Sequence, residues 1–204
     1  MKVLLVNGSP NVAGCTYTAL QEVAGQLDKS GIETEIFHIG KKPVQGCIDC
    51  GKCRELGRCV FQDDLYNELL ACIKEADGIV IGSPVYCAGP NGALCAILDR
   101  LIYSAGAYLT NKPSAAVVSC RRGGASSTFD RLNKYFTVNQ MPVVTSQYWN
   151  SVHGFTPEDV KKDLEGLQTM RTLGNNMAWM LKTIADSQYP LPTREEWIPT
   201  HFIK

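Results

Sequence analysis

The stretch KVLLVNGSP, residues 2–10, is an unbroken apolar run that stops at a glycine-serine-proline turn. Because apolar and polar residues do not alternate in residues 2–7, the run predicts a strand that is buried on both faces. Residues 16–30 follow with apolar side chains at helical spacing, and Gly31 is the expected stop. A buried strand followed by a helix is the unit from which parallel α/β sheets are built.

The same alternation continues along the chain. Further strands are expected at residues 34–39, 78–83, 114–120 and 142–146. Further helices are expected at residues 65–75, 92–104, 128–136 and 157–185, the last with a break near Gly166 or Gly174. Five strands with right-handed crossovers predict an α/β fold with a doubly wound parallel sheet in the order 2-1-3-4-5.

Length, composition and charge narrow the functional classes. The 204 residues fit one domain, expected at residues 1–185, with a cysteine-rich insertion at 40–63 and a tail at 186–204 that wraps a surface or a partner subunit. The formal net charge of zero gives no sign of a nucleic-acid partner. Because no apolar run approaches the roughly 20 residues of a membrane span, and the first run is too short for a signal peptide, a cytoplasmic protein is expected.

The loop between the first strand and the first helix, residues 8–18, is rich in small and hydroxyl side chains. At a helix N-terminus, unpaired N–H groups and the helix dipole favour an anion, although an ordinary capped helix is the alternative. The loop has neither the lysine of a nucleoside triphosphate loop nor the GxGxxG spacing of a dinucleotide loop. The cofactor-binding residues expected here are Ser9, Asn11, Gly14, Cys15, Thr16 and Thr18.

Two more loops follow the expected third and fourth strands, at the edge where open α/β sheets bind ligands. Residues 83–92, SPVYCAGPNG, mix small residues with one aromatic, and residues 119–127, SCRRGGASS, add glycines and arginines. Each loop alone is compatible with an ordinary turn, but together with the first loop they predict a site for a flat ring with a phosphate. The ring-side residues expected are Ser83, Pro84, Val85, Tyr86, Ser119, Arg121, Arg122, Gly123 and Gly124.

The most specific short pattern is Cys47-x2-Cys50-x2-Cys53-x5-Cys59. The chain has nine cysteines, and an odd number argues against a complete disulfide framework. Closely spaced thiolates suit a [4Fe–4S] cluster or tetrahedral zinc, and free or redox-active thiols are the third alternative.

These motifs carry a resemblance. Gly8-Ser9-Pro10, Gly14, Thr16, the run from Ser83 to Tyr86, Gly92 and Asp99-Arg100 resemble the NAD(P)H-dependent FMN reductase family of flavodoxin-like proteins over about residues 1–185. The cysteine motif is similar to that of the iron–sulfur flavoproteins, which carry it after the second strand.

The resemblance implies that the first loop holds the FMN phosphate and that the other two embrace the isoalloxazine. It also implies NADH or NADPH as electron donor, a cluster on the four cysteines, and a homodimer or homotetramer. Cys15 departs from the family, which often has Asn before the loop threonine, so its contact with phosphate is in doubt.

The expected function is therefore that of an FMN-dependent oxidoreductase. It would pass electrons from NAD(P)H to flavin, quinone or other small acceptors, or to an electron-transfer protein through a cluster. The alternatives are an electron-transfer flavoprotein that shuttles between protein partners and a zinc-stapled binding module without flavin. No catalytic side chain is predicted. Asp63 and Asp64 are expected to cap a helix, and Asp99-Arg100 to form a helix-surface or interface pair.

Overall fold

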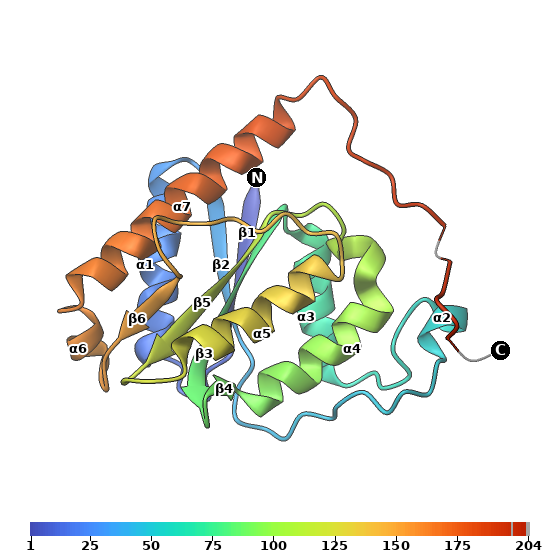
Figure 1. Cartoon of the computed structure of the whole chain (residues 1–204), viewed down its shortest axis with the longest axis horizontal. Coiled ribbons are helices and arrows are strands. Elements are labelled where there is room, and N and C mark those ends of the chain that lie inside the picture. Colours follow the sequence, from blue (N-terminus) through green and yellow to red (C-terminus); the bar gives the residue numbers. More distant parts are fainter. Residues whose placement is uncertain (197, 203–204) are drawn as a thin grey trace.

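Five parallel strands form the main sheet of the computed structural model, in the order β2-β1-β3-β5-β6 (Figure 1). They are β1 (Lys2–Asn7), β2 (Glu33–His38), β3 (Gly78–Tyr86), β5 (Ser114–Cys120) and β6 (Ser151–His153). A short strand, β4 (Gly89–Pro90), pairs antiparallel with the end of β3. The predicted order 2-1-3-4-5 is confirmed once β4 is set aside. The structure describes residues 1–196 and 198–202, so Trp197 of the predicted tail lies outside it, as does the side chain of Asp64.

The central strands are buried on both faces, as their continuous apolar sequences predict. Val3 and Leu5 of β1 belong to one hydrophobic cluster, whereas Leu4 and Val6 belong to the other. Every residue of β5 is buried. Because successive side chains of a strand point to opposite faces, one short run supplies both cores.

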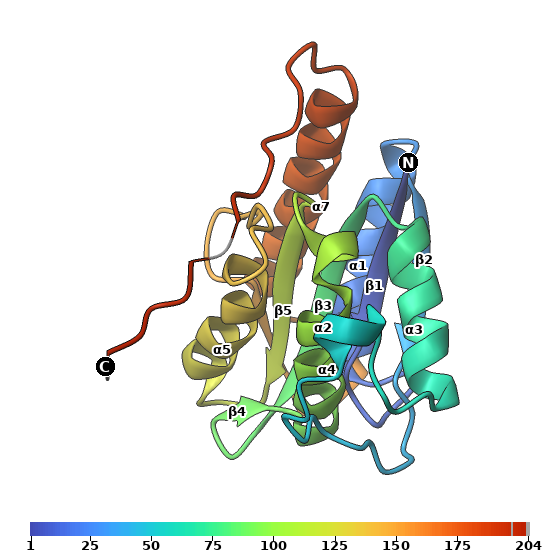
Figure 2. The ribbon, with the colours of Figure 1, turned by 90° about the vertical axis from the view of Figure 1, so that its right-hand side faces the viewer.

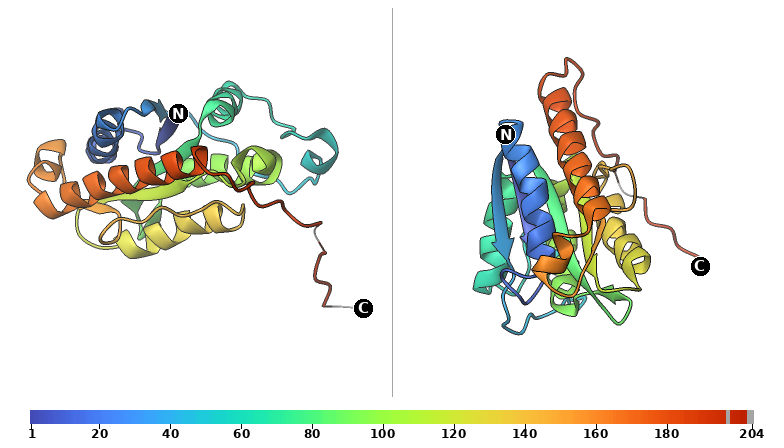
Figure 3. Two further views of the ribbon diagram at one scale, coloured as in Figure 1. Left: turned by 90° about the horizontal axis from the view of Figure 1, so that it is seen from above. Right: turned by 90° about the vertical axis from the view of Figure 1, so that its left-hand side faces the viewer.

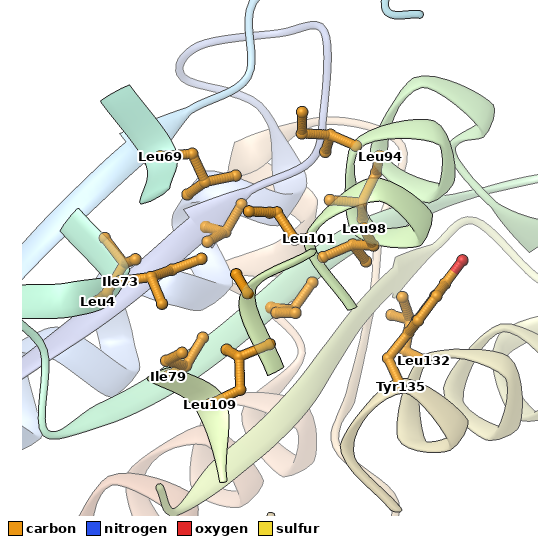
Figure 4. Close-up of a cluster of buried hydrophobic side chains, with 14 of the residues drawn as sticks. Leu4, Leu69, Ile73, Ile79, Leu94, Leu98, Leu101, Leu109, Leu132 and Tyr135 are labelled. Atoms are coloured by element: carbon orange, nitrogen blue, oxygen red, sulfur yellow. The ribbon is translucent and has the colours of Figure 1, made fainter. Parts of the chain in front are cut away.

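Helices cover both faces of the sheet. One face carries α1 (Cys15–Lys29), α6 (Pro157–Val160) and α7 (Leu164–Ala185), and the other carries α3 (Asp64–Glu75), α4 (Gly92–Leu109) and α5 (Ala125–Thr137) (Figure 2, Figure 3). Figure 4 shows the hydrophobic cluster to which Leu4 belongs, where leucines of α4 meet β1 and α3. Asp63 begins α3 as predicted, because its carboxylate accepts the N–H of Tyr66 at 3.1 Å.

By length and composition alone, α4 would also be a candidate membrane span, contrary to the expectation from the sequence. Its Leu94, Leu98 and Leu101 are instead buried against the sheet (Figure 4). The apolar character of α4 is therefore that of a core helix.

The predicted position of the fifth strand is wrong. Residues 142–146 contribute only an isolated bridge between Val143 and Ser114, and the strand beside β5 is Ser151–His153. Pro142 has no N–H for a ladder, and the chain leaves the sheet edge through the polar residues that follow before it returns. The last helix is broken at residues 161–163, close to Gly166, while Gly174 lies inside an unbroken α7.

The cysteine-rich segment follows β2, as predicted, and contains one short helix, α2 (Cys53–Leu56). The described residues after Ala185 form no regular helix or strand and extend beyond the body of the domain (Figure 1, Figure 3). This tail is tied to the domain by a hydrogen bond from Asn111 Nδ2 to the carbonyl of Pro192 at 2.9 Å. Tyr189, Leu191 and Phe202 of the tail are exposed.

Gly8→Ala is expected to destabilise the fold, because a Cβ there would lie 2.6 Å from the carbonyl oxygen of Gly82 and 2.5 Å from Cδ2 of Leu94. Overpacking of this kind costs about 1–3 kcal/mol of the free energy of unfolding. Gly25→Ala in α1 is the matched control, since its Cβ would meet nothing within 4 Å. It should gain about 0.5–1 kcal/mol. Urea unfolding followed by circular dichroism measures the free energy of unfolding of both variants. A Gly8→Ala protein as stable as the wild type would contradict the close packing of Gly8 against Gly82 and Leu94.

Candidate functional site

The carboxyl ends of β1, β3 and β5 meet at one edge of the sheet and enclose a groove of about 350 Å³. A volume of this size lies within the range of small-molecule sites. The three predicted loops all contribute to it. Of the predicted residues, those that line the groove are Ser9, Asn11, Cys15, Thr16, Pro84, Val85, Tyr86, Ser119 and Arg121.

The first loop is held from behind by three side chains that bind its backbone. Asn7 Oδ1 accepts the N–H of Ser9 at 3.1 Å, and the ring nitrogen Nε2 of His38 lies 2.8 Å from the carbonyl oxygen of Ser9. Asn91 Nδ2 donates to the carbonyl of Gly8 at 2.7 Å. These contacts fix the path of the loop without using the N–H groups at the start of α1.

The start of α1 keeps the features of an anion site. Gly14 is the N-cap and supplies no side-chain hydrogen bond, and the first turn holds no acidic residue. The unpaired N–H groups there favour a negative group. Thr16 Oγ1 and Ser119 Oγ lie 2.8 Å apart and join α1 to β5, whereas Thr18 Oγ1 donates to the carbonyl of Gly14 at 3.1 Å. Gly14 itself lines an adjoining hollow of about 530 Å³.

The two ring-side loops pack against each other. Cys87 and Ala88 connect β3 to β4 with φ of 50° and 59°, which is typical of a type I′ turn and rare for residues with a Cβ. Gly124 has φ of 92°, and a Cβ there would lie 2.7 Å from Cα of Ala88. Ser127 Oγ donates to the carbonyl of Ala88 at 2.6 Å. The third loop therefore supports the second.

Six predicted residues do not line the groove, namely Gly14, Thr18, Ser83, Arg122, Gly123 and Gly124. Ser83 is fully buried, and its hydroxyl accepts the N–H of Asn91 at 3.0 Å and donates to the carbonyl of Pro84 at 2.8 Å. Its role in the structure is to hold the second loop rather than to face the groove.

Part of the groove lining was not predicted from the sequence. Gly154 and Phe155 line the groove directly after β6, and Phe155 is 77 % exposed. The rule that loops at strand ends bind ligands would have found both residues had the fifth strand been placed at Ser151–His153. Lys41 was also missed; it lines the adjoining hollow beside the first loop.

Two thiols face the groove, Cys15 and Cys120. Burial raises the pKa of both. A thiol with a raised pKa is protonated near pH 7 and is a poor nucleophile. The groove therefore offers a surface for binding rather than a reactive thiolate.

The four clustered cysteines line a second cavity, of about 70 Å³, between the insertion and α4. Cys47 and Cys50 are exposed, Cys53 is half-buried and Cys59 is buried. In the described part of the chain, no group of three or more His, Cys, Asp or Glu side chains is placed to hold a metal ion. The four thiols are the soft donors that iron–sulfur clusters and zinc require. They line one cavity, but they are not arranged as a coordination shell.

Arg100 lies beneath this cavity, and the predicted helix-surface role for it is wrong. Its side chain is 0 % exposed, and Nη2 lies 2.5 Å from Oδ2 of Asp63. Burial opposes ionisation of Asp63, but the hydrogen bond from Arg100 brings the pKa of that carboxyl below its ordinary value. Asp99 instead accepts the hydroxyl of Tyr135 at 2.6 Å, so the two neighbours on α4 have separate partners.

Known proteins are similar to this chain in sequence and in fold. The family model for NADPH-dependent FMN reductases matches residues 1–156. An iron–sulfur flavoprotein of Methanocaldococcus jannaschii is 37 % identical over 192 residues, which cover 90 % of this chain and 99 % of that protein.

Two solved structures have the same fold. RosB with bound 8-demethyl-8-formylriboflavin-5′-phosphate has a TM-score of 0.74 at 19 % identity, covering 93 % of this chain and 82 % of that one. A flavodoxin from the domain Archaea has a TM-score of 0.59 at 16 % identity, covering 89 % and 99 %. The fold is therefore flavodoxin-like. Since the family model spans most of the chain and the Methanocaldococcus relative aligns over nearly its whole length, the chain belongs to the NADPH-dependent FMN reductase family, in its iron–sulfur flavoprotein branch, and is an FMN-dependent oxidoreductase.

Proposed function

We propose that FMN binds in the groove at the ends of β1, β3 and β5 and that NADH or NADPH supplies its electrons. The observation that carries the proposal is that three separate loops meet around one groove beside an uncapped helix start. The nicotinamide donor is supported by the family to which the chain belongs.

At the phosphate end, Ser9, Asn11 and Thr16 would bind the FMN phosphate together with the backbone N–H groups of Gly14 and Cys15. This arrangement uses the partial positive charge of the start of α1. The hydroxyl of Thr18 would fix the helix start rather than touch the phosphate, because it already donates to Gly14.

At the ring end, Pro84, Val85 and Tyr86 would line one side of the isoalloxazine and Ser119 the other. Arg121 or Arg122 would offset negative charge on the reduced ring. When bound, FMN accepts a hydride and releases electrons singly or in pairs. The protein holds and orients the ring; Ser83, Gly123 and Gly124 set the path of the loops.

We further propose that Cys47, Cys50, Cys53 and Cys59 hold a [4Fe–4S] cluster. All four line one cavity, and turns at Gly51 and Gly57, with φ of 69° and 63°, let the insertion fold back on itself. Formation of the shell would accompany metal binding, because ligand sites and their metals fold together. A bound cluster supplies one-electron transfer.

The acceptor is proposed to be a free flavin, a quinone or another small oxidant, or an electron-transfer protein. Exposure of Cys47 and Cys50 favours a protein partner at the cysteine cavity. Electron transfer to such a partner is the second candidate function. A homodimer or homotetramer, in which the tail at 186–204 reaches from the domain at 1–185 to a neighbour, would cover the exposed Tyr189 and Phe202. The nine free thiols suit the reducing cytoplasm.

Reduction by nicotinamide is the first test of this function. Anaerobic addition of NADPH or NADH should bleach the flavin absorbance, and added quinone or free FMN should sustain steady turnover. Stopped-flow and steady-state absorbance measure the two steps. Flavin that only a protein reductant can bleach would contradict the enzyme and favour the carrier.

Val12→Asp should weaken FMN binding because it adds a negative charge to the phosphate loop. Val12 is 63 % exposed and lines the hollow at the start of α1. Repulsion of about 1.4 kcal/mol raises the dissociation constant roughly tenfold. Riboflavin, which has no phosphate, should bind as before, and Val12→Asn is the uncharged control. Flavin fluorescence quenching on titration into deflavinated protein measures each affinity; equal weakening of both ligands would contradict the assignment.

Cys50→Ser should remove iron and acid-labile sulfide but leave FMN in place. Anaerobically purified wild-type protein should hold about four of each per chain. Cys72→Ser is the control, because its thiol lies on α3 and donates to Glu35 at 3.3 Å, outside the cysteine cavity. Metal, sulfide and flavin analysis checks all three proteins. Wild-type material with zinc in place of iron, or with free thiols alone, would contradict the cluster.

A further inference from the structure

Arg100 joins the two ends of the cysteine-rich insertion. From α4, its Nη1 donates to the carbonyl of Gln45 at 3.3 Å, just before the first cysteine. Its Nη2 donates to the carbonyl of Phe61 at 2.8 Å, just after the last cysteine. A single buried guanidinium therefore fixes both ends of the segment that carries the four thiols.

The third nitrogen of the Arg100 guanidinium, Nε, donates to a sulfur. Nε lies 3.5 Å from Sγ of Cys59, the one buried thiol of the four. The guanidinium carbon lies 4.8 Å from the ring centroid of Tyr66 and 5.7 Å from that of Phe61, so aromatic faces hold its plane. Arginine stays protonated throughout the physiological pH range, and the donor is therefore permanent.

We propose that Arg100 is the positioning residue that sets the reduction potential of the cluster held by the four cysteines, by donating Nε–H to the sulfur of Cys59. The inference rests on the cluster proposed above. Hydrogen bonds to the sulfurs and nearby charge are the factors by which a protein tunes such a potential. Reduction adds one electron and one negative charge to the cluster, so a fixed donor and a buried positive charge favour the reduced state.

Asp63 opposes this effect. Its carboxylate pairs with Nη2 of the guanidinium and neutralises part of its charge, although 44 % of the Asp63 side chain is exposed. Removal of the Asp63 charge should therefore shift the potential in the opposite direction from loss of the arginine. A residue that merely anchors the insertion would give no such pair of opposite signs.

The experiment compares three variants by anaerobic redox titration of the flavin-loaded, cluster-bearing protein. Arg100→Lys keeps a positive charge but loses the planar set of donors. Asp63→Asn removes the opposing charge and keeps a good N-cap for α3. Arg171→Gln is the control, because Arg171 lies on α7, on the other face of the sheet, where it pairs with Glu22 at 2.6 Å. Electron paramagnetic resonance follows the cluster, and visible absorbance follows the flavin.

Arg100→Lys should lower the equilibrium constant for cluster reduction about tenfold, which is about 59 mV for a one-electron couple. Asp63→Asn should raise that constant severalfold, and Arg171→Gln should change it less than twofold. The flavin potential should be the same in all four proteins.

Variants that keep their iron but have the wild-type cluster potential, or shifts of the same sign in Arg100→Lys and Asp63→Asn, would overturn the inference alone. If Arg100→Lys fails to fold or loses iron, a rise in Asp63→Asn supports the inference and an unchanged potential overturns it. A wild-type protein without iron and sulfide would overturn the cluster proposal, and this inference with it.

Discussion

The structure depends on the burial of its parallel strands on both faces. Because β1 supplies Leu4 and Val6 to one core and Val3 and Leu5 to the other, its direction and register are fixed from both sides. Parallel neighbours in register with it must then end at the same edge. The groove is a consequence of this constraint, since every loop that lines it leaves a strand at that edge.

This dependence explains what could be predicted from the sequence. Continuous apolar runs identified the four strands from β1 to β5 that belong to the parallel sheet, and the strand-end rule then identified three loops that do meet. The fifth strand was misplaced because residues 142–146 are more apolar than Ser151–His153, the short segment that pairs with β5. Because of that error, Gly154 and Phe155 were not predicted to line the groove, although the strand-end rule applies to them as well.

The four cysteines that share a cavity could be predicted from the sequence, but the residues that surround them could not. Spacing alone gathered Cys47 to Cys59 into one group, and all four do line one cavity. Nothing local in the sequence distinguishes a buried arginine from an exposed one on an amphipathic helix. Arg100 is buried only because Asp63, Tyr66 and the two ends of the insertion enclose it, and these contacts come from two separate parts of the chain, residue 45 and residues 61–66. Tertiary contacts of this kind have no periodic signal.

One helix connects the two sites. Asn91 caps α4 through Ala93 and also holds the carbonyl of Gly8 in the first loop, so the start of α4 supports the groove. Arg100 lies on the same helix, about 12 Å further along its axis at a rise of roughly 1.5 Å per residue. Because one face of α4 is packed into the core, the distance between groove and cysteine cavity is set by the fold.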